Sequence, residues 1–145
     1  MTDSLPERLA EIRDEFLELA EPDRLQLLLE YSYELPAIPA EYEGHPELAE
    51  RVVECQSPVY IIVDVDDCGT VAMHATAPAE APTTRGFASI LAQGLTGLSA
   101  AEVAAVPADY PQTLGLTRVV SPLRISGMTG MLLRAQRQAR AKSGL

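Results

Sequence analysis

The fold is indicated by residues 58–75, which read PVYIIVDVDDCGTVAMHA. The first eight residues are rich in β-branched side chains, and the Asp-Asp-Cys-Gly sequence at 66–69 is typical of a tight turn. Residues 70–75 can then pair back on the first run. The stretch therefore predicts a β-hairpin, and residues 48–54 are a candidate for a third strand.

Two helices are predicted before this hairpin. The sequence Ser4-Leu5-Pro6-Glu7 reads as a capping box that starts the first helix. The apolar stripe of that helix repeats every three or four residues and comprises Leu5, Leu9, Ile12, Phe16 and Leu19. The second helix is expected from Glu21-Pro22-Asp23 to Pro36, with apolar positions Leu25, Leu28, Leu29 and Leu35. The segment 36–47 carries three prolines and a glycine, which predicts a loop.

Helical patterns return after Pro82. Thr84 is the expected cap of a helix over 85–94, and Ser99 with Glu102 predicts the cap of a short helix ending near Pro107. A last helix is expected from Ser121-Pro122, with an apolar row of Ile125, Met128, Leu132 and Ala135. The order of elements predicts an α+β fold, in which helices pack on one face of a small antiparallel sheet of about three strands. A chain of 145 residues fits one domain over 1–145.

The charge of the chain argues against two classes of partner. The net charge is -10, which disfavours binding to nucleic acid or to an anionic membrane surface. The charge is also unevenly distributed, because residues 1–67 hold 18 acidic and 4 basic residues while residues 68–145 hold 3 acidic and 7 basic ones. No run of about 18 apolar residues predicts a transmembrane span. The first residues resemble no signal peptide, so a cytoplasmic location with reduced thiols is expected.

Cys55 is the first candidate for chemistry. It lies in a polar segment, Glu54-Cys55-Gln56-Ser57, just before the strongest predicted strand. A thiol on a loop held by a rigid scaffold suits a reactive group, whereas the alternative is a buried cysteine that packs as a small apolar side chain. The neighbouring Glu54 raises the pKa of a thiol, so a thiolate at Cys55 needs a cation from elsewhere in the fold.

The other soft ligands give weaker patterns. Cys68 lies in the predicted turn beside two aspartates and is interpreted as a turn residue. His45 and His74 complete the set, and no CxxC or HxxxH spacing indicates a metal site. A cysteine hydrolase would need one of these histidines as a base near Cys55, and no sequence pattern places one there.

Two arginines are candidates for binding an anion. Arg85 and Arg124 both lie where a helix is expected to begin. Free backbone N–H groups together with a guanidinium can bind an anion or a thiolate. The alternative for each is a solvated arginine.

A set of short motifs occurs along the chain in a defined order and spacing. They are Leu35-Pro36, Glu54-Cys55-Gln56-Ser57 with the aromatic Tyr60, Arg85-Gly86, Leu114-Gly115-Leu116, Ser121-Pro122-Leu123-Arg124 and Gly127-Met128. In this order and spacing, the set resembles the SufE family. It extends from about Leu5 to Arg140. The family commonly has glycine where this chain has Glu54, and tryptophan where it has Tyr60.

The resemblance implies a fold similar to that of IscU-type scaffold proteins and a role in iron–sulfur cluster assembly. In the family, the cysteine of the Cys-Gln-Ser motif, here Cys55, accepts sulfur from the persulfide of a SufS-like cysteine desulfurase. It then passes the sulfur to a SufB-type scaffold. Arg124 matches an arginine at the desulfurase-docking surface. The protein would need no cofactor of its own, because the pyridoxal phosphate belongs to the desulfurase.

This role describes a carrier and activator of the desulfurase more than a stand-alone enzyme. Two alternatives remain open at this stage. The chain could be an acidic adaptor that activates a desulfurase without carrying sulfur, or a scaffold that holds a metal or a cluster.

Overall fold

The computed structural model describes residues 5–144. In chain order its helices and strands are α1 (Glu7–Glu18), α2 (Glu21–Tyr33), β1 (Glu50–Arg51), β2 (Tyr60–Val65), β3 (Val71–Thr76), α3 (Pro82–Leu95), α4 (Ala100–Ala104) and α5 (Pro122–Ser143). Short 3-10 turns lie at Ala40–Tyr42, Pro46–Leu48 and Tyr110–Leu114. The three strands form one antiparallel sheet in the order β1-β2-β3, which confirms the α+β prediction.

The predicted hairpin is confirmed, and its turn lies between Val65 and Val71. Strands β2 and β3 pair along their whole length, from Tyr60 opposite Thr76 to Val65 opposite Val71. In the turn, one carboxylate oxygen of Asp66 accepts hydrogen bonds from the backbone N–H groups of residues 68 and 70, both at 2.9 Å. Such a local side-chain bond is the reason why an aspartate here favours a turn over a longer strand.

The prediction of a strand over 48–54 is wrong in its length, because the strand comprises Glu50–Arg51 alone. Opposite residue 48, on the side before β1, side chains of α5 bond to the backbone edge of β2 instead. Gln138 accepts a 2.9 Å hydrogen bond from the backbone N–H of Val63, and Lys142 donates to the carbonyl of the same residue. Pairing of residues 48–49 with β2 would compete with α5 for these groups, since each backbone group needs one partner. On the other side of β1, the turn in which the Cys55 N–H donates to the Val52 carbonyl ends the strand.

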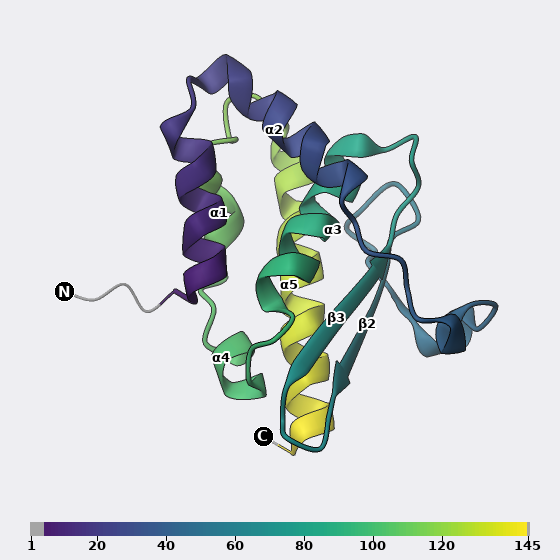
Figure 1. The fold of residues 1–145 in the computed structure, drawn as a ribbon. Coiled ribbons are helices and arrows are strands. Elements are labelled where there is room, and N and C mark those ends of the chain that lie inside the picture. The colour runs from purple at the N-terminus through teal and green to yellow at the C-terminus, as the bar shows by residue number, and fades with distance from the viewer. Residues whose placement is uncertain (1–4, 145) are drawn as a thin grey trace.

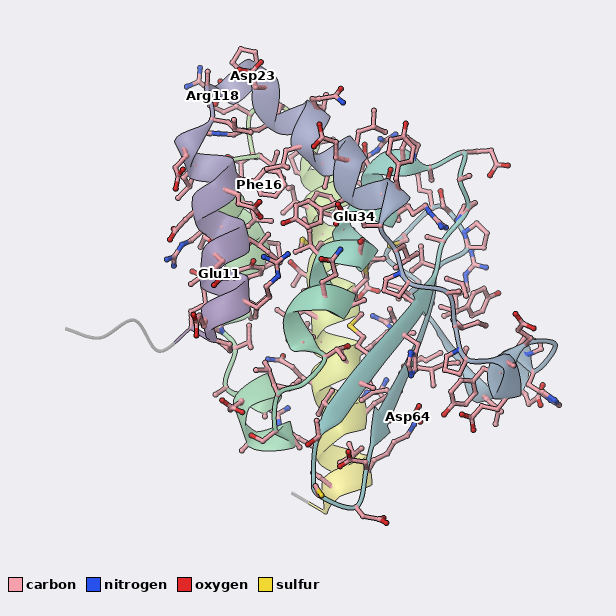
Figure 2. The ribbon with its side chains drawn as sticks, in the orientation of Figure 1. Glu11, Phe16, Asp23, Glu34, Asp64 and Arg118 are labelled. Carbon is pink, nitrogen blue, oxygen red and sulfur yellow. The ribbon has the colours of Figure 1, made fainter. Side chains whose placement is uncertain are left out.

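Helices α3 and α5 pack on one face of the sheet, and α1 and α2 complete the helical layer (Figure 1). The face toward the helices contributes Ile61, Val63, Val71, Met73 and Ala75 to the buried core. Figure 2 shows Phe16 on the inner side of α1. Its ring stacks on that of Tyr31, with the two ring centroids 6.0 Å apart. The opposite face is partly covered by the segment 36–49, whose Tyr42 hydroxyl donates a hydrogen bond to Asp64.

The helix starts agree with the sequence in two cases and differ in a third. Ser99 and Glu102 form the expected reciprocal capping box, and the Ser121 side chain caps α5. Thr84 is not a cap, because α3 begins at Pro82 and its cap position is Ala81. Proline is well suited to a first helical position, so it starts the helix two residues before the threonine. The capping-box residue Ser4 lies outside the described residues.

The second helix ends at Tyr33, three residues before Pro36. Its Leu28 is buried, whereas Leu25 is 43% exposed and does not belong to the core. Among residues 5–144, no helix combines the length and apolar character that a membrane crossing requires.

Candidate functional site around Cys55

The loop between β1 and β2 carries Cys55 and is closed by backbone hydrogen bonds. The N–H of Val52 donates to the carbonyl of Val59 at 2.9 Å, and the N–H of Cys55 donates to the carbonyl of Val52 at 3.1 Å. These bonds make a tight turn whose inner side faces α5. Cys55 is a free thiol and is buried, with 8% of its surface exposed.

Two glycines of α5 make room for this loop. A Cβ at Gly127 would lie 2.9 Å from the Sγ of Cys55, and a Cβ at Gly130 would lie 2.8 Å from the carboxylate of Glu54. Real Cβ atoms essentially never approach other heavy atoms so closely, so a side chain at either position would displace the thiol or the carboxylate from where it lies. Because positions 127 and 130 are three residues apart, they lie on the same face of the helix.

The thiol of Cys55 lies in the wall of a pocket of about 280 Å³. The pocket is bounded by the cysteine loop, by the segment that leads into α3 and by the first turns of α5. Its lining residues are Glu54, Cys55, Gln56, Ser57, Glu80, Ala81, Pro82, Thr84, Leu123, Arg124 and Gly127. Residues from three separate segments therefore line one pocket together with Cys55.

Burial raises the pKa of the Cys55 thiol, and the negative charge of Glu54 adds to this effect. The positive charges of Arg134 and Arg51 oppose it, but the net direction is upward. An ordinary cysteine is already mainly protonated at neutral pH. In the closed loop Cys55 is therefore a protonated, weakly nucleophilic thiol.

Glu54 is bound to α5 by an ion pair with Arg134, in which Oε1 lies 2.7 Å from Nη1. The same Nη1 donates a 3.1 Å hydrogen bond to the carbonyl of Gly130. Glu50 lies on the other side of Arg134 and also pairs with Arg137. Every non-glycine residue from 5 to 144 has negative φ, so the loop requires no glycine at position 54.

Arg124 lies at the pocket, in the first turn of α5, with an exposed side chain. Its backbone N–H donates to the carbonyl of Ser121 at 3.1 Å and to the hydroxyl of the same residue at 3.4 Å, so the expected free N–H is absent here too. The structure thus brings Cys55 and Arg124 to the same pocket. These two residues, both predicted from the sequence to belong to a site, lie 69 positions apart in the chain.

Arg85 lies elsewhere and does not line this pocket. Its Nε donates to the carbonyl of Ser32 at 2.9 Å, and its Nη1 donates to the carbonyl of Ala77 at 2.6 Å. Its backbone N–H is also used, by the carbonyl of Ala81. Arg85 therefore ties the start of α3 to the end of α2 and to the segment after β3, and its expected free N–H is absent.

The other cysteine and the two histidines lie apart from one another in the fold. Cys68 is exposed in the hairpin turn and is not bonded to Cys55. His74 lies on β3, where Nε2 is 3.1 Å from Oδ2 of Asp64 (labelled in Figure 2), and His45 pairs with Glu47. Within residues 5–144, no three His, Cys, Asp or Glu side chains gather as a metal ion would require.

Sequence reasoning missed the contribution of Glu54, Arg134 and the two glycines as a unit. The sequence indicated Glu54 only as an unfavourable neighbour of the thiol, and no pattern linked Arg134 to Cys55. A signal was present in the spacing of Gly127 and Gly130, because two glycines three residues apart in a helix favour the close approach of another segment.

The chain is similar to known proteins over most of its length. The family model described as SufE, Fe-S metabolism associated domain, matches residues 10–139. A SufE-like protein of Mycobacterium tuberculosis is 50% identical over 137 residues, 94% of each chain. A SufE-like protein of Synechocystis is 32% identical over 94% of this chain and 82% of its own. The solution structure of a hypothetical protein from Thermus thermophilus is 36% identical, with a TM-score of 0.84 over 97% of this chain and 99% of that one.

Proposed function

Because the chain belongs to the SufE family of Fe–S metabolism, we propose that Cys55 accepts sulfur from the persulfide of a cysteine desulfurase and passes it to an iron–sulfur cluster scaffold. The observation that carries this proposal is the placement of one free thiol in the wall of a pocket whose other residues come from three segments. A carrier needs one such thiol and a surface on which its donor can dock.

The transfer is a nucleophilic displacement at sulfur. The Cys55 thiolate attacks the outer sulfur of the donor persulfide, and a new S–S bond forms at Cys55. The S–S bond of the donor breaks, and the donor cysteine leaves as a thiolate. The persulfide proton stays on the transferred sulfur, so the products are a persulfide on Cys55 and a free donor cysteine. The step consumes no oxidant and needs no metal.

The buried state of Cys55 protects the thiol between transfers. An exposed thiolate is oxidised easily, and a persulfide is lost to other thiols. The raised pKa of Cys55 in the closed loop favours the neutral thiol, which is a weaker nucleophile than the thiolate. Docking of the desulfurase must therefore open the loop or supply positive charge before sulfur moves.

Arg124 is the arginine that we assign to docking. It is exposed at the pocket, so a carboxylate on the desulfurase can reach its guanidinium without disturbing the core. Arg85 enters the proposal only as a residue that positions α3, because its guanidinium is bonded to two backbone carbonyls.

The proposal is tested by the rate of a cysteine desulfurase with and without this protein. We expect wild type and Cys68→Ser to stimulate sulfide or alanine production to the same extent, and Cys55→Ser to give no stimulation. Cys68→Ser is the matched control, because it removes the other thiol from an exposed turn. Full stimulation by Cys55→Ser would overturn the carrier role and favour an adaptor that carries no sulfur.

A further inference from the structure

The Glu54–Arg134 pair joins the cysteine loop to the long helix directly beside Cys55. Residue 54 is adjacent to the thiol in sequence, and residue 134 lies on α5, two turns beyond Gly127. The side chain of Arg134 is 16% exposed, and that of Glu54 is 40% exposed. Partly buried pairs of this kind are screened less by solvent than pairs on an open surface.

Arg134 has few other ways to be satisfied. Among the described residues, none accepts a hydrogen bond from its buried Nε, and the carboxylate oxygen of Glu50 is 3.6 Å from that atom. Moving Glu54 away would therefore leave the guanidinium with the Gly130 carbonyl and the more distant Glu50. An unpaired, partly buried charge is costly, so the pair favours the closed loop.

Among the described residues, the side chains of residues 52–58 make no other ion pair or hydrogen bond. The thiol and the Glu54 carboxylate pack against Gly127 and Gly130 of α5, which have no side chains to interact with them. Val53, on the same loop, is 72% exposed. The ion pair is thus a specific polar tie that must be broken, together with the packing of Val52 and Cys55 in the core, before the loop can leave α5.

We propose that Glu54 and Arg134 form a latch that holds the Cys55 loop closed, and that a cationic side chain of the docking partner opens it by pairing with Glu54. The proposal rests on the function proposed above and adds to it how the thiol is released. The two exposures decide which residue the partner reaches, because Glu54 is open to solvent and Arg134 is not. Pairing of Glu54 with the partner's cation also offsets a negative charge beside the thiol, so opening and activation are coupled.

The latch is tested by alkylation of Cys55 with iodoacetamide in a Cys68→Ser background, followed over a full pH range. The midpoint of the profile reports the thiol pKa, and the plateau at high pH reports access to the thiolate. We expect Glu54→Gln, which keeps the side-chain size, to raise the plateau rate about fivefold, equivalent to about 1 kcal/mol. Arg134→Gln should raise it to a similar extent, and the double variant should raise it no further.

The matched control is Glu21→Gln, which breaks a remote ion pair with Arg118 and should leave the profile unchanged. A Glu54→Gln plateau equal to that of wild type, with only a lower midpoint, would overturn the latch, because Glu54 would then act through its charge alone. A double variant whose plateau rate rises by the product of the two single increases would overturn the latch as well. The iodoacetamide assay needs no desulfurase, so failure of the latch and failure of sulfur acceptance are distinguished.

Discussion

The Sγ of Cys55 occupies space that exists because residue 127 has no side chain. A Cβ at that position would lie 2.9 Å from the sulfur. The contact joins the loop after β1 to the second turn of α5, and so links the strand that begins the sheet to the helix that covers it. The shelter of the thiol is therefore a property of the helix as much as of the loop.

Replacement of Gly127 by alanine should decrease stability. An unhindered Gly→Ala change within a helix stabilises by about 1 kcal/mol, whereas overpacking costs about 1–3 kcal/mol. We expect the free energy of unfolding in urea to fall by about 1 kcal/mol. The exposed neighbour Ser126→Ala should show no loss. If Gly127→Ala stabilises the protein as an unhindered site would, the thiol does not fill this space.

The raised pKa of Cys55 makes stability depend on pH in a defined direction. Burial favours the neutral thiol and so contributes to the free energy of unfolding. This stabilisation is fully present below the pKa of the unfolded thiol and is lost as the pH rises through the folded-state pKa. Wild type should therefore lose stability relative to Cys55→Ser above about pH 8.5. Urea unfolding of both proteins over this range gives the difference. A difference that stays constant, or that grows in favour of wild type, would contradict the burial of a neutral thiol.

Arg124→Ala should weaken docking more than chemistry. Loss of an exposed cation at an interface typically costs about 1 kcal/mol, so the concentration of this protein that half-saturates a desulfurase should rise about fivefold. The maximal rate should change little. Arg118→Ala is the control, because that arginine is also exposed but lies beside Glu21, remote from the thiol. Equal effects of the two variants would show that Arg124 contributes only general charge.

Arg85→Met should affect folding before it affects sulfur transfer. The change leaves the carbonyls of Ser32 and Ala77 without their charged donors, which we expect to cost about 2–3 kcal/mol of unfolding free energy. Urea unfolding measures this loss. A variant that keeps its stability but no longer stimulates a desulfurase would instead place Arg85 at the docking surface.

The parts of this structure that the sequence predicts are those decided by neighbouring residues. The hairpin follows from two β-branched runs around an aspartate-led turn, and the capped starts of α4 and α5 follow from Ser99 and Ser121. Cys55 was singled out by its polar loop and by the resemblance of the whole motif set to one family. Apart from the family resemblance, which extends along the chain, these signals lie within a few residues of the feature that they predict.

What escaped prediction depends on residues far apart in the chain. The Glu54–Arg134 pair spans 80 positions, and the bonds from Arg85 to Ser32 and from Gln138 to Val63 span 53 and 75. A single sequence gives no information on which distant residues meet. Position 54 illustrates the consequence, because a glutamate that is unfavourable to its neighbouring thiol becomes a tie to the helix once Arg134 is in place.

The central claim is that Cys55 carries sulfur, and peptide mass spectrometry tests it most directly. The protein is incubated with a cysteine desulfurase and cysteine, digested without reductant and compared with a sample that received no cysteine. The account predicts that the Cys55 peptide gains the mass of one sulfur atom while the Cys68 peptide does not. A Cys55 peptide of unchanged mass, in a reaction where the desulfurase turns over, would contradict it.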